Sequence, residues 1–407
     1  MKNVITKYKN NKNFHTSLIN CIFEFKLDKE EIMAYTILTK LLSKTNKKYP
    51  EIDLFAREKL NRYIMNLSIS NQSINDTYFI NYSCLLPSDG VIKANYLESA
   101  IKFLLDTIYE TNIESIELFQ REKKLYIETL LNNYKNIEFI AEKNMLDLLD
   151  DNCKFNKIKY KDIENINNLT LNDVIEFYNK YIKNIKPKIF VYGNIDEKLV
   201  EKTINDYFTK LDLKDYKIIK DYNSFYENDV LVDKTDYSKY YQSIVYLNYK
   251  VKDYSESDFY KLYLINLLLS NPASDILFNN LRKKNNLVYS CGSSIMIRNG
   301  LLVMKATTSK KNIVLAKMVI EKCINDLKDI ENYKENIERI IKRLETNLIR
   351  EKDNFFVEPT DIINEYYKTD IKSELVLETI KNISLDDLKD CISRLEVACI
   401  YTLEGVE

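Results

Sequence analysis

The sequence predicts an α+β fold of two tandem domains of one type, each an α/β sandwich of about 200 residues. Two observations support this prediction. The chain has 407 residues, which is more than one hydrophobic core usually serves, since single domains run to ~100–200 residues. The order of strands and helices in the first half also returns in the second half, which indicates a duplication. We expect domains at 1–212 and 235–407, joined by a polar, charged linker at 213–234.

Each half opens with a strand that is followed by a helix. The strands are rich in β-branched and aromatic residues, and the helices begin at pairs typical of helix starts. These pairs are Asp28 with Glu31 in the first half, and Ser255 with Asp258 in the second. The strand and helix are 17–27 and 28–44 in the first half, and 240–251 and 255–271 in the second.

The later elements of the two halves also correspond in order. Each half has a second strand and helix, then a long charged helix, then a short helix with a capping pair and a last strand. In the first half these are 77–86, 96–110, 116–134, 169–182 and 188–195. In the second half they are 300–309, 312–330, 336–352, 383–395 and 397–403. A single capping pair is weak support, but the ordered series indicates two related domains.

Composition excludes several classes of function. Sixty basic and sixty-one acidic residues leave a net charge of −1, so no general attraction to nucleic acid is expected. No stretch is long and apolar enough to span a membrane, and the start has no apolar run typical of a signal peptide. The seven cysteines are scattered and form no CxxC pair. We therefore expect a cytoplasmic protein with reduced thiols.

The stretch LFNNLRKKNNLVYSCGSS, residues 277–294, carries a family resemblance. It is similar to the L-F-x-x-[IL]-R-E-K-x-x-L-x-Y-S segment of the pitrilysin and mitochondrial-processing-peptidase family, which are inverzincin zinc peptidases. It departs from that pattern at Lys283, where the family has an acidic residue. The resemblance covers nearly the whole chain and implies the same fold of two homologous α/β sandwiches.

The resemblance implies a degenerate zinc site in the first half. Family members bind zinc through H-x-x-E-H on a helix that is followed by a K-K-x-P-like turn, which is KKYP (47–50) here. Counting back from that turn places Thr36, Thr39 and Lys40 at the His, Glu and His positions. Threonine binds Zn²⁺ poorly and a protonated lysine repels it. We therefore expect no metal in this chain and no peptide hydrolysis by the chain alone.

The third zinc ligand of the family also has no counterpart. The segment QREKKLYIETLL (120–131) resembles the one that bears this ligand, and Thr129 occupies the ligand position. Glu122 and Glu128 are acidic residues on either side and do not complete a site. The single histidine, His15, lies before the first strand, and we expect an ordinary surface or half-buried side chain there rather than a ligand.

The resemblance also implies roles for Arg282 and Tyr289. In the family, this pair holds the substrate carbonyl and stabilises the oxyanion at the zinc of the first domain. In some members the zinc motif and the Arg/Tyr pair stand in two different chains, and this sequence resembles the chain that keeps the pair. Such bacterial chains often accompany a zinc-bearing paralogue. The implied partners are an H-x-x-E-H paralogue that carries the zinc and a peptide substrate, with a homodimer expected in isolation.

Other interpretations remain open on the residues alone. An arginine that ends a helix usually faces solvent, and a tyrosine in a strand usually packs in a core. The chain can therefore be an inactive scaffold in which Arg282 and Tyr289 are relics, or an independent peptide-binding protein. A zinc-bearing neighbour that lacks the Arg/Tyr pair favours the subunit interpretation. Affinity for peptides without any partner favours the independent one.

Overall fold

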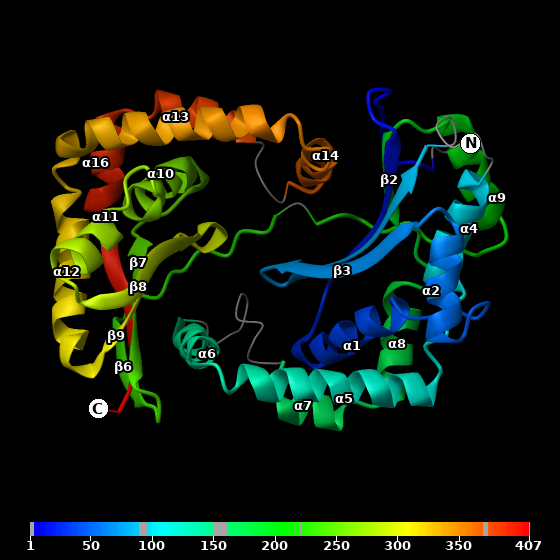
Figure 1. The fold of residues 1–407 in the computed structure, drawn as a ribbon, viewed down its shortest axis with the longest axis horizontal. Coiled ribbons are helices and arrows are strands. Elements are labelled where there is room, and N and C mark those ends of the chain that lie inside the picture. Colours follow the sequence, from blue (N-terminus) through cyan, green and yellow to red (C-terminus); the bar gives the residue numbers. More distant parts are fainter. Residues whose placement is uncertain (1–3, 89–95, 150–160, 220, 369–372, 407) are drawn as a thin grey trace. The chain divides into compact units, whose positions relative to one another are not determined.

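The computed structural model describes residues 4–88, 96–149, 161–219, 221–368 and 373–406. The chain forms two compact units, and each is described by itself. The described residues of unit 1 come from 1–132, 157–222 and 355–370, and those of unit 2 from 133–156, 223–354 and 371–407 (Figure 1). Each unit therefore contains one segment from the opposite half of the sequence.

Unit 1 is built on a five-stranded sheet with the order β1-β5-β2-β4-β3. β1 runs parallel to β5, and the other neighbours are antiparallel. β3 forms one edge of this sheet. The strands are β1 (Lys7–Asn10), β2 (Thr16–Lys26), β3 (Asn66–Ile74), β4 (Thr77–Pro87) and β5 (Lys188–Gly193).

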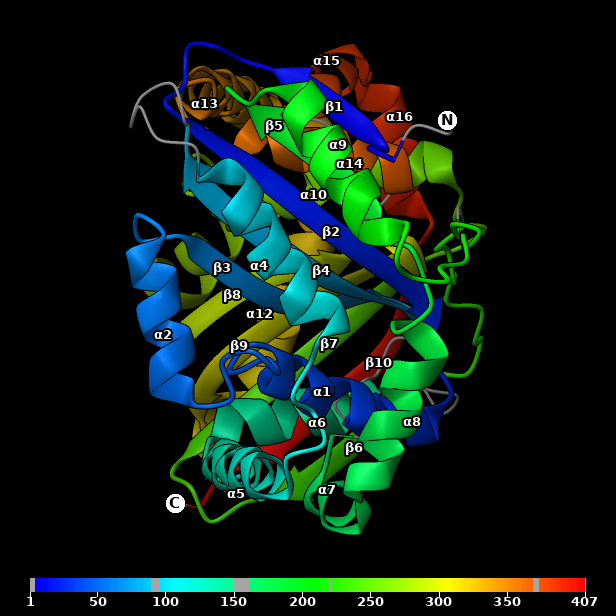
Figure 2. The same ribbon diagram turned by 90° about the vertical axis from the view of Figure 1, so that its right-hand side faces the viewer.

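Helices cover one face of the unit 1 sheet, and Figure 2 shows α4 and α9 in front of β2. Alternate residues of β2, among them Ile19, Cys21 and Phe23, join the main core of the unit. This alternation follows from the pleat, which points successive side chains to opposite faces. The helices of this half in unit 1 are α1 (Ile32–Leu42), α2 (Ile52–Asn61), α4 (Leu97–Tyr109), α5 (Ile116–Asn133), α7 (Ile163–Asn168), α8 (Leu171–Tyr181) and α9 (Glu197–Phe208).

Unit 2 repeats this arrangement with the sheet order β6-β10-β7-β9-β8. β6 runs parallel to β10, and β8 forms the edge that corresponds to β3. The repeated strand order confirms the predicted α+β fold of two like sandwiches. The strands are β6 (Val232–Tyr237), β7 (Gln242–Val251), β8 (Val288–Met296), β9 (Leu301–Ser309) and β10 (Leu395–Glu404).

Helices of unit 2 also cover one face of its sheet. Buried side chains of β7 and β9, such as Leu247 and Met304, join those of α10 and α12 in one core. The helices of this half in unit 2 are α10 (Phe259–Ser270), α11 (Ile276–Phe278), α12 (Ile313–Asp326), α13 (Lys334–Glu351), α15 (Ser373–Asn382) and α16 (Leu385–Ser393).

The opposite face of each sheet is covered by a helix from the other half of the sequence. In unit 2 this helix is α6 (Ile137–Leu149), where Asn144 Nδ2 donates a hydrogen bond of 2.9 Å to the hydroxyl of Tyr401 on β10. In unit 1 it is α14 (Val357–Tyr367), which places Tyr367 among the buried rings of the sheet. The exchange was not part of the sequence prediction, and the predicted domain boundaries stay a prediction.

Part of the predicted linker packs against the sheet of unit 1. Tyr222 is only 2% exposed and its hydroxyl donates to a carboxylate oxygen of Glu24 at 2.6 Å, both in unit 1. Burial raises the pKa of Glu24, and the hydrogen bond from Tyr222 opposes that rise. The end of the predicted linker enters β6, which begins at Val232.

A buried carboxylate links the start of α10 to the end of α16 in unit 2. Asp258 is 2% exposed and accepts hydrogen bonds from Arg394 at 2.5 Å, from Lys261 at 2.8 Å and from the backbone N–H of Ser255 at 3.1 Å. Burial disfavours its charge, but these hydrogen bonds outweigh burial and lower the pKa of Asp258 to about 2. The sequence predicted the capping role of Asp258 and not its link to Arg394.

Replacing Asp258 by asparagine is expected to destabilise the fold by about 3 kcal/mol at neutral pH, because it removes the buried carboxylate and leaves the Arg394 guanidinium only its pair with the exposed Asp390. The folded pKa lies below the unfolded value, so this stability is present above pH ~4 and is lost as the pH falls toward 2. Urea unfolding at pH 7 and pH 3 measures both effects. Asp386→Asn, at an exposed position of α16, is the control. Equal stability of the two variants at pH 7 would contradict the prediction.

Candidate functional site

Arg282 stands at the end of a short helical segment that leads into β8. The segment Asn279–Lys284 is π-helical, and such turns are frequent at functional sites. Leu281 is fully buried and anchors the segment, whereas Arg282 is exposed. The chain then reverses at Asn286, whose φ of 48° is a left-handed conformation that asparagine tolerates. The core contact of Leu281 thus leaves Arg282 at the surface.

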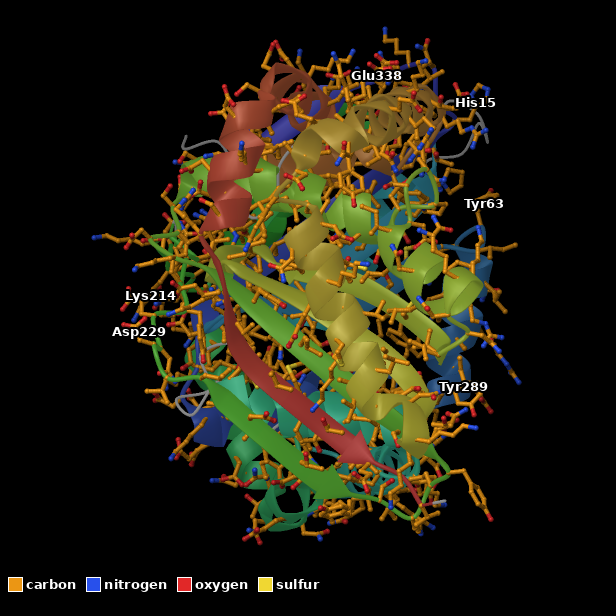
Figure 3. All side chains as sticks on the ribbon, turned by 90° about the vertical axis from the view of Figure 1, so that its left-hand side faces the viewer. His15, Tyr63, Lys214, Asp229, Tyr289 and Glu338 are labelled. Carbon is orange, nitrogen blue, oxygen red and sulfur yellow. The ribbon has the colours of Figure 1, made fainter. Side chains whose placement is uncertain are left out.

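Tyr289 stands in a β-bulge on the edge strand β8. The pairing of β8 with β9 shifts between Val288 and Ser290, so Tyr289 is the additional residue. A bulge of this kind redirects a side chain out of the normal alternation of a strand. Tyr289 is accordingly 56% exposed, and Figure 3 shows it at the margin of the unit.

One hydrogen bond brings Arg282 close to Tyr289. The Nη1 atom of Arg282 donates to the backbone oxygen of Val288 at 2.6 Å. This bond fixes the guanidinium beside the residue that precedes Tyr289. The remaining N–H groups of the guanidinium and the phenolic O–H are therefore two donors on the same surface of unit 2. Donors of this kind can stabilise a carbonyl oxygen that develops negative charge.

A cavity of about 580 Å³ lies beside the same strand in unit 2. Ser290–Ser294 of β8 form one wall, and Glu138 and Glu142 of α6 lie on another. Glu138 pairs with Lys305 of β9 at 3.1 Å. The edge strand next to Arg282 and Tyr289 thus borders an open cavity lined by both polar and apolar side chains.

The structure brings three of the predicted zinc positions together on α1 in unit 1. Thr36 and Thr39 are buried and Lys40 is half-buried. The hydroxyl of Thr36 donates to the backbone oxygen of Ile32 at 2.8 Å, and that of Thr39 donates to the backbone oxygen of Thr36 at 3.0 Å. Both hydroxyls are thus engaged by their own helix. All three side chains line a cavity of about 490 Å³.

The fourth predicted position, Thr129, does not line this cavity. Thr129 is exposed on α5, and its hydroxyl donates to the backbone oxygen of Leu125 at 2.9 Å. Glu122 and Tyr126 of the same helix line the cavity instead. Glu128 is exposed. The sequence indicated Glu122 only as a neighbour of the site, because spacing alone does not show which face of α5 meets α1.

The residues at the degenerate zinc positions do not fit Zn²⁺. A zinc site needs about three ligands among imidazole, thiolate and carboxylate groups, and this cavity offers hydroxyl and amide groups, three ammonium groups and one carboxylate, that of Glu122. Among the residues that the structure describes, no three His, Cys, Asp or Glu side chains are grouped to hold a metal ion. His15 is exposed on the loop before β2 (Figure 3).

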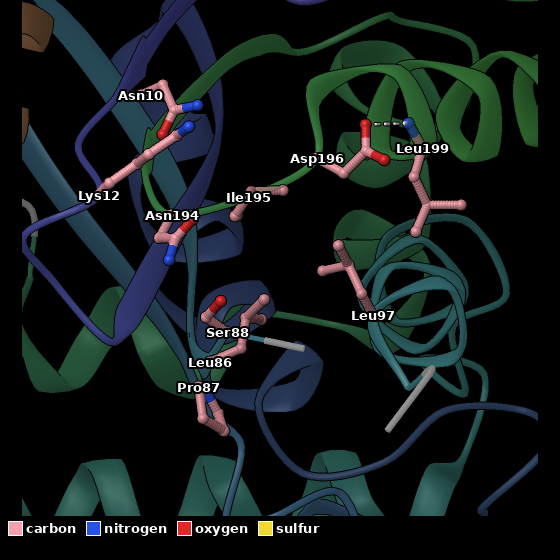
Figure 4. Close-up of a pocket in the computed structure, with 10 residues that line it drawn as sticks. All are labelled: Asn10, Lys12, Leu86, Pro87, Ser88, Leu97, Asn194, Ile195, Asp196 and Leu199. Carbon is pink, nitrogen blue, oxygen red and sulfur yellow. Dashed lines mark hydrogen bonds between the residues drawn. The ribbon is translucent and has the colours of Figure 1, made fainter. Parts of the chain in front are cut away.

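A third cavity, of about 340 Å³, lies near the start of α9 in unit 1 (Figure 4). The carboxylate of Asp196 in its wall accepts hydrogen bonds from the backbone N–H groups of Lys198 and Leu199, at 3.0 Å and 3.2 Å. These bonds cap α9. The carboxylate in this wall therefore serves the helix.

Comparisons with known proteins relate the chain to M16 peptidases that are described as inactive. Residues 168–344 match the family described as "Peptidase M16 inactive domain". A Bacillus subtilis protein named "Probable inactive metalloprotease YmfF" is 20% identical over 396 residues, which cover 94% of this chain and 91% of that protein. The match of residues 168–344 and the relative that spans nearly the whole chain both make this protein similar to M16 peptidases that are described as inactive.

Solved structures share the fold over nearly the full chain. A conserved protein from Enterococcus faecalis V583 matches with a TM-score of 0.88 at 20% identity, covering 98% of this chain and 96% of that one. The peptidase M16 inactive domain from Pseudomonas fluorescens matches with a TM-score of 0.76 at 12% identity, covering 98% and 95%. No described helix of this chain combines the length and the hydrophobicity needed to cross a bilayer.

Proposed function

We propose that this chain is the non-catalytic subunit of a heteromeric zinc metallopeptidase that processes peptides. In this role it supplies Arg282 and Tyr289 to the active site of a partner chain. The partner carries H-x-x-E-H and the zinc ion, and this chain carries no metal. The proposal places the complex in the bacterial cytoplasm, in keeping with the described cysteines, which are all free thiols.

The observation that carries the proposal is the pairing of Arg282 and Tyr289 at one exposed edge. A tyrosine kept only for the core would be buried, yet Tyr289 is 56% exposed at a bulge. The bond from Arg282 to the Val288 backbone oxygen holds the guanidinium beside it. Both donors are thus accessible to a substrate carbonyl. Arginine suits this role because it stays charged and presents a planar fork of donors.

The edge strand β8 supports a peptide as the ligand. β8 has one sheet neighbour, β9, among the described strands. An exposed edge can pair with an extended peptide through backbone hydrogen bonds. The cavity beside Ser290–Ser294 offers space for a side chain of that peptide.

Reconstitution with a zinc-bearing partner tests the proposal. This chain and an H-x-x-E-H paralogue that lacks the Arg/Tyr pair are purified separately and together, and cleavage of a quenched fluorescent peptide library is measured. We expect cleavage by the mixture only, its loss with 1,10-phenanthroline, and its return with added zinc.

Equal cleavage by the partner alone would contradict the proposal. In that case, co-elution of the two chains would identify this chain as a scaffold. Peptide binding by this chain without co-elution would identify an independent binding protein.

A further inference from the structure

The cavity at the degenerate zinc positions has an excess of positive charge. Lys40 of α1 and Lys44, which follows α1, line it together with Lys161, which precedes α7. Glu122 of α5 is the one carboxylate among the described residues of its wall. Three ammonium groups therefore face a single carboxylate in a partly enclosed space. A metal cation is the ligand that such a cavity disfavours most.

The three ammonium groups have no carboxylate partner in the described part of the chain. Neither Lys40, Lys44 nor Lys161 forms an ion pair there. The Nζ atom of Lys40 lies 5.2 Å from the centre of the Tyr126 ring instead. Burial, and after it the charge of Lys40, lower the pKa of Lys161. The charges of Lys40 and Lys161 are thus close enough to repel each other, and an anion between them would remove that cost.

Glu122 provides a second, independent indication of a ligand. Its side chain is only 4% exposed, and its Oε1 atom has no hydrogen-bond partner among the described residues. A buried carboxylate oxygen without a donor is costly, and such atoms are uncommon in folded proteins. Oε1 therefore needs a hydrogen-bond donor. A fully deprotonated inorganic anion has no such donor, so it does not satisfy Oε1.

We propose that this cavity binds a carboxylate of a peptide, with Lys40, Lys44 and Lys161 contacting the carboxylate and Glu122 Oε1 accepting a backbone N–H of the same peptide. The residues at the former metal positions thus bind an anion. That the ligand is a peptide rests on the proposed function. The carboxylate comes either from the peptide's C-terminus or from an acidic side chain, since both lie next to a backbone N–H.

The wall formed by β3 agrees with a peptide ligand. Ile69, Ser70 and Asn71 of this strand line the cavity. Asn71 is held in place because its Nδ2 atom donates to the hydroxyl of Thr39 at 3.0 Å. β3 has one sheet neighbour, β4, among the described strands, so a peptide beside it can direct a carboxylate to α1.

Fluorescence anisotropy of the full chain without a partner tests the proposal. The probes are three mixtures of short peptides of random sequence with an N-terminal fluorophore: free C-terminus, amidated C-terminus, and amidated C-terminus without Asp and Glu. We expect the third mixture to bind at least tenfold more weakly than the first. Comparison of the first two distinguishes the C-terminal carboxylate from an acidic side chain.

Substitution of the cavity lysines provides the second part of the test. Lys40→Gln and Lys161→Gln should each weaken binding of the carboxylate-bearing mixtures by about ten- to a hundredfold, the usual size of one charge-assisted hydrogen bond. Lys124→Gln is the matched control, because it removes the same charge from an exposed position of α5 outside the cavity. Melting curves verify that each variant is folded.

Three results would overturn the proposal: binding that does not depend on a carboxylate, Lys40→Gln equal to Lys124→Gln, or no binding of any mixture. The outcome is separate from that of the proposed function. A complex that cleaves peptides while this chain alone binds no carboxylate keeps the subunit role and removes the cavity proposal. Carboxylate binding by this chain, without any complex that cleaves peptides, keeps the cavity proposal and removes the subunit role.

Discussion

Replacing Tyr289 by phenylalanine in the reconstituted peptidase should lower kcat/KM by ~100- to 1000-fold, the usual cost of removing one oxyanion donor. The ring and its bulge remain, so only the phenolic O–H is lost. Arg282→Ala should lower kcat/KM at least as much, because it also removes the hydrogen bond to the Val288 backbone oxygen that orders the start of β8. The same quenched peptide library measures both variants at matched complex concentrations.

Lys283→Ala is the control for these variants. Lys283 is exposed like its neighbour Arg282, and its Nζ atom lies 5.6 Å from the centre of the Phe278 ring. Its removal changes the charge of the same surface by the same amount. We expect it to leave kcat/KM within a few fold. Rates of Tyr289→Phe equal to the wild type, with the complex still formed, would exclude a role in the active site.

Replacing Tyr367 by alanine should destabilise unit 1 by about 3–5 kcal/mol, the usual cost of removing a buried aromatic side chain. The Tyr367 ring is 1% exposed, and its centre lies 5.5 Å from that of Phe79 and 6.0 Å from that of Phe190. Its hydroxyl is 3.1 Å from that of Tyr216. Removal opens a cavity under α14 and leaves the Tyr216 hydroxyl with fewer partners.

Thermal unfolding should show this change as a fall in Tm of roughly 10 °C. Tyr367→Phe separates the two contributions, because it keeps the ring and loses only the hydroxyl pair. It should cost about 1 kcal/mol. If alanine and phenylalanine at position 367 gave the same Tm, the packing of α14 on the sheet would not contribute as described.

Local sequence signals predicted much of the fold. The pairs Asp28 with Glu31, Thr170 with Asp173, Ser255 with Asp258 and Ser384 with Asp387 all form capping boxes. A capping pair can be recognised in the sequence because its two residues are only three positions apart. The same strand order appears in both units. This agrees with the sequence, in which strand-like and helix-like segments follow each other in the same order in both halves.

Long-range features were not readable from the sequence. β2 is buried along nearly its whole length, and its sequence cannot show that α14 covers one face of the sheet. The short parallel strands β1 and β6 carry too few residues for a clear period. At the candidate site, the family resemblance indicated Thr36, Thr39 and Lys40, by their distance from the KKYP turn. The hydrogen bond from Arg282 to Val288 and the presence of Lys161 in the wall of the cavity could not be predicted, because both depend on tertiary packing.

The exchange of helices has a consequence for synthesis of the chain on the ribosome. The last strand of the unit 1 sheet, β5, ends at Gly193, and α14 begins roughly 160 residues later, at Val357. At ~5–20 residues per second this is a delay of roughly 10–30 s. Throughout it, the rings of Phe79 and Phe190 have no α14 to cover them. A nascent chain of this protein therefore presents an apolar sheet face to chaperones until its second half is nearly complete.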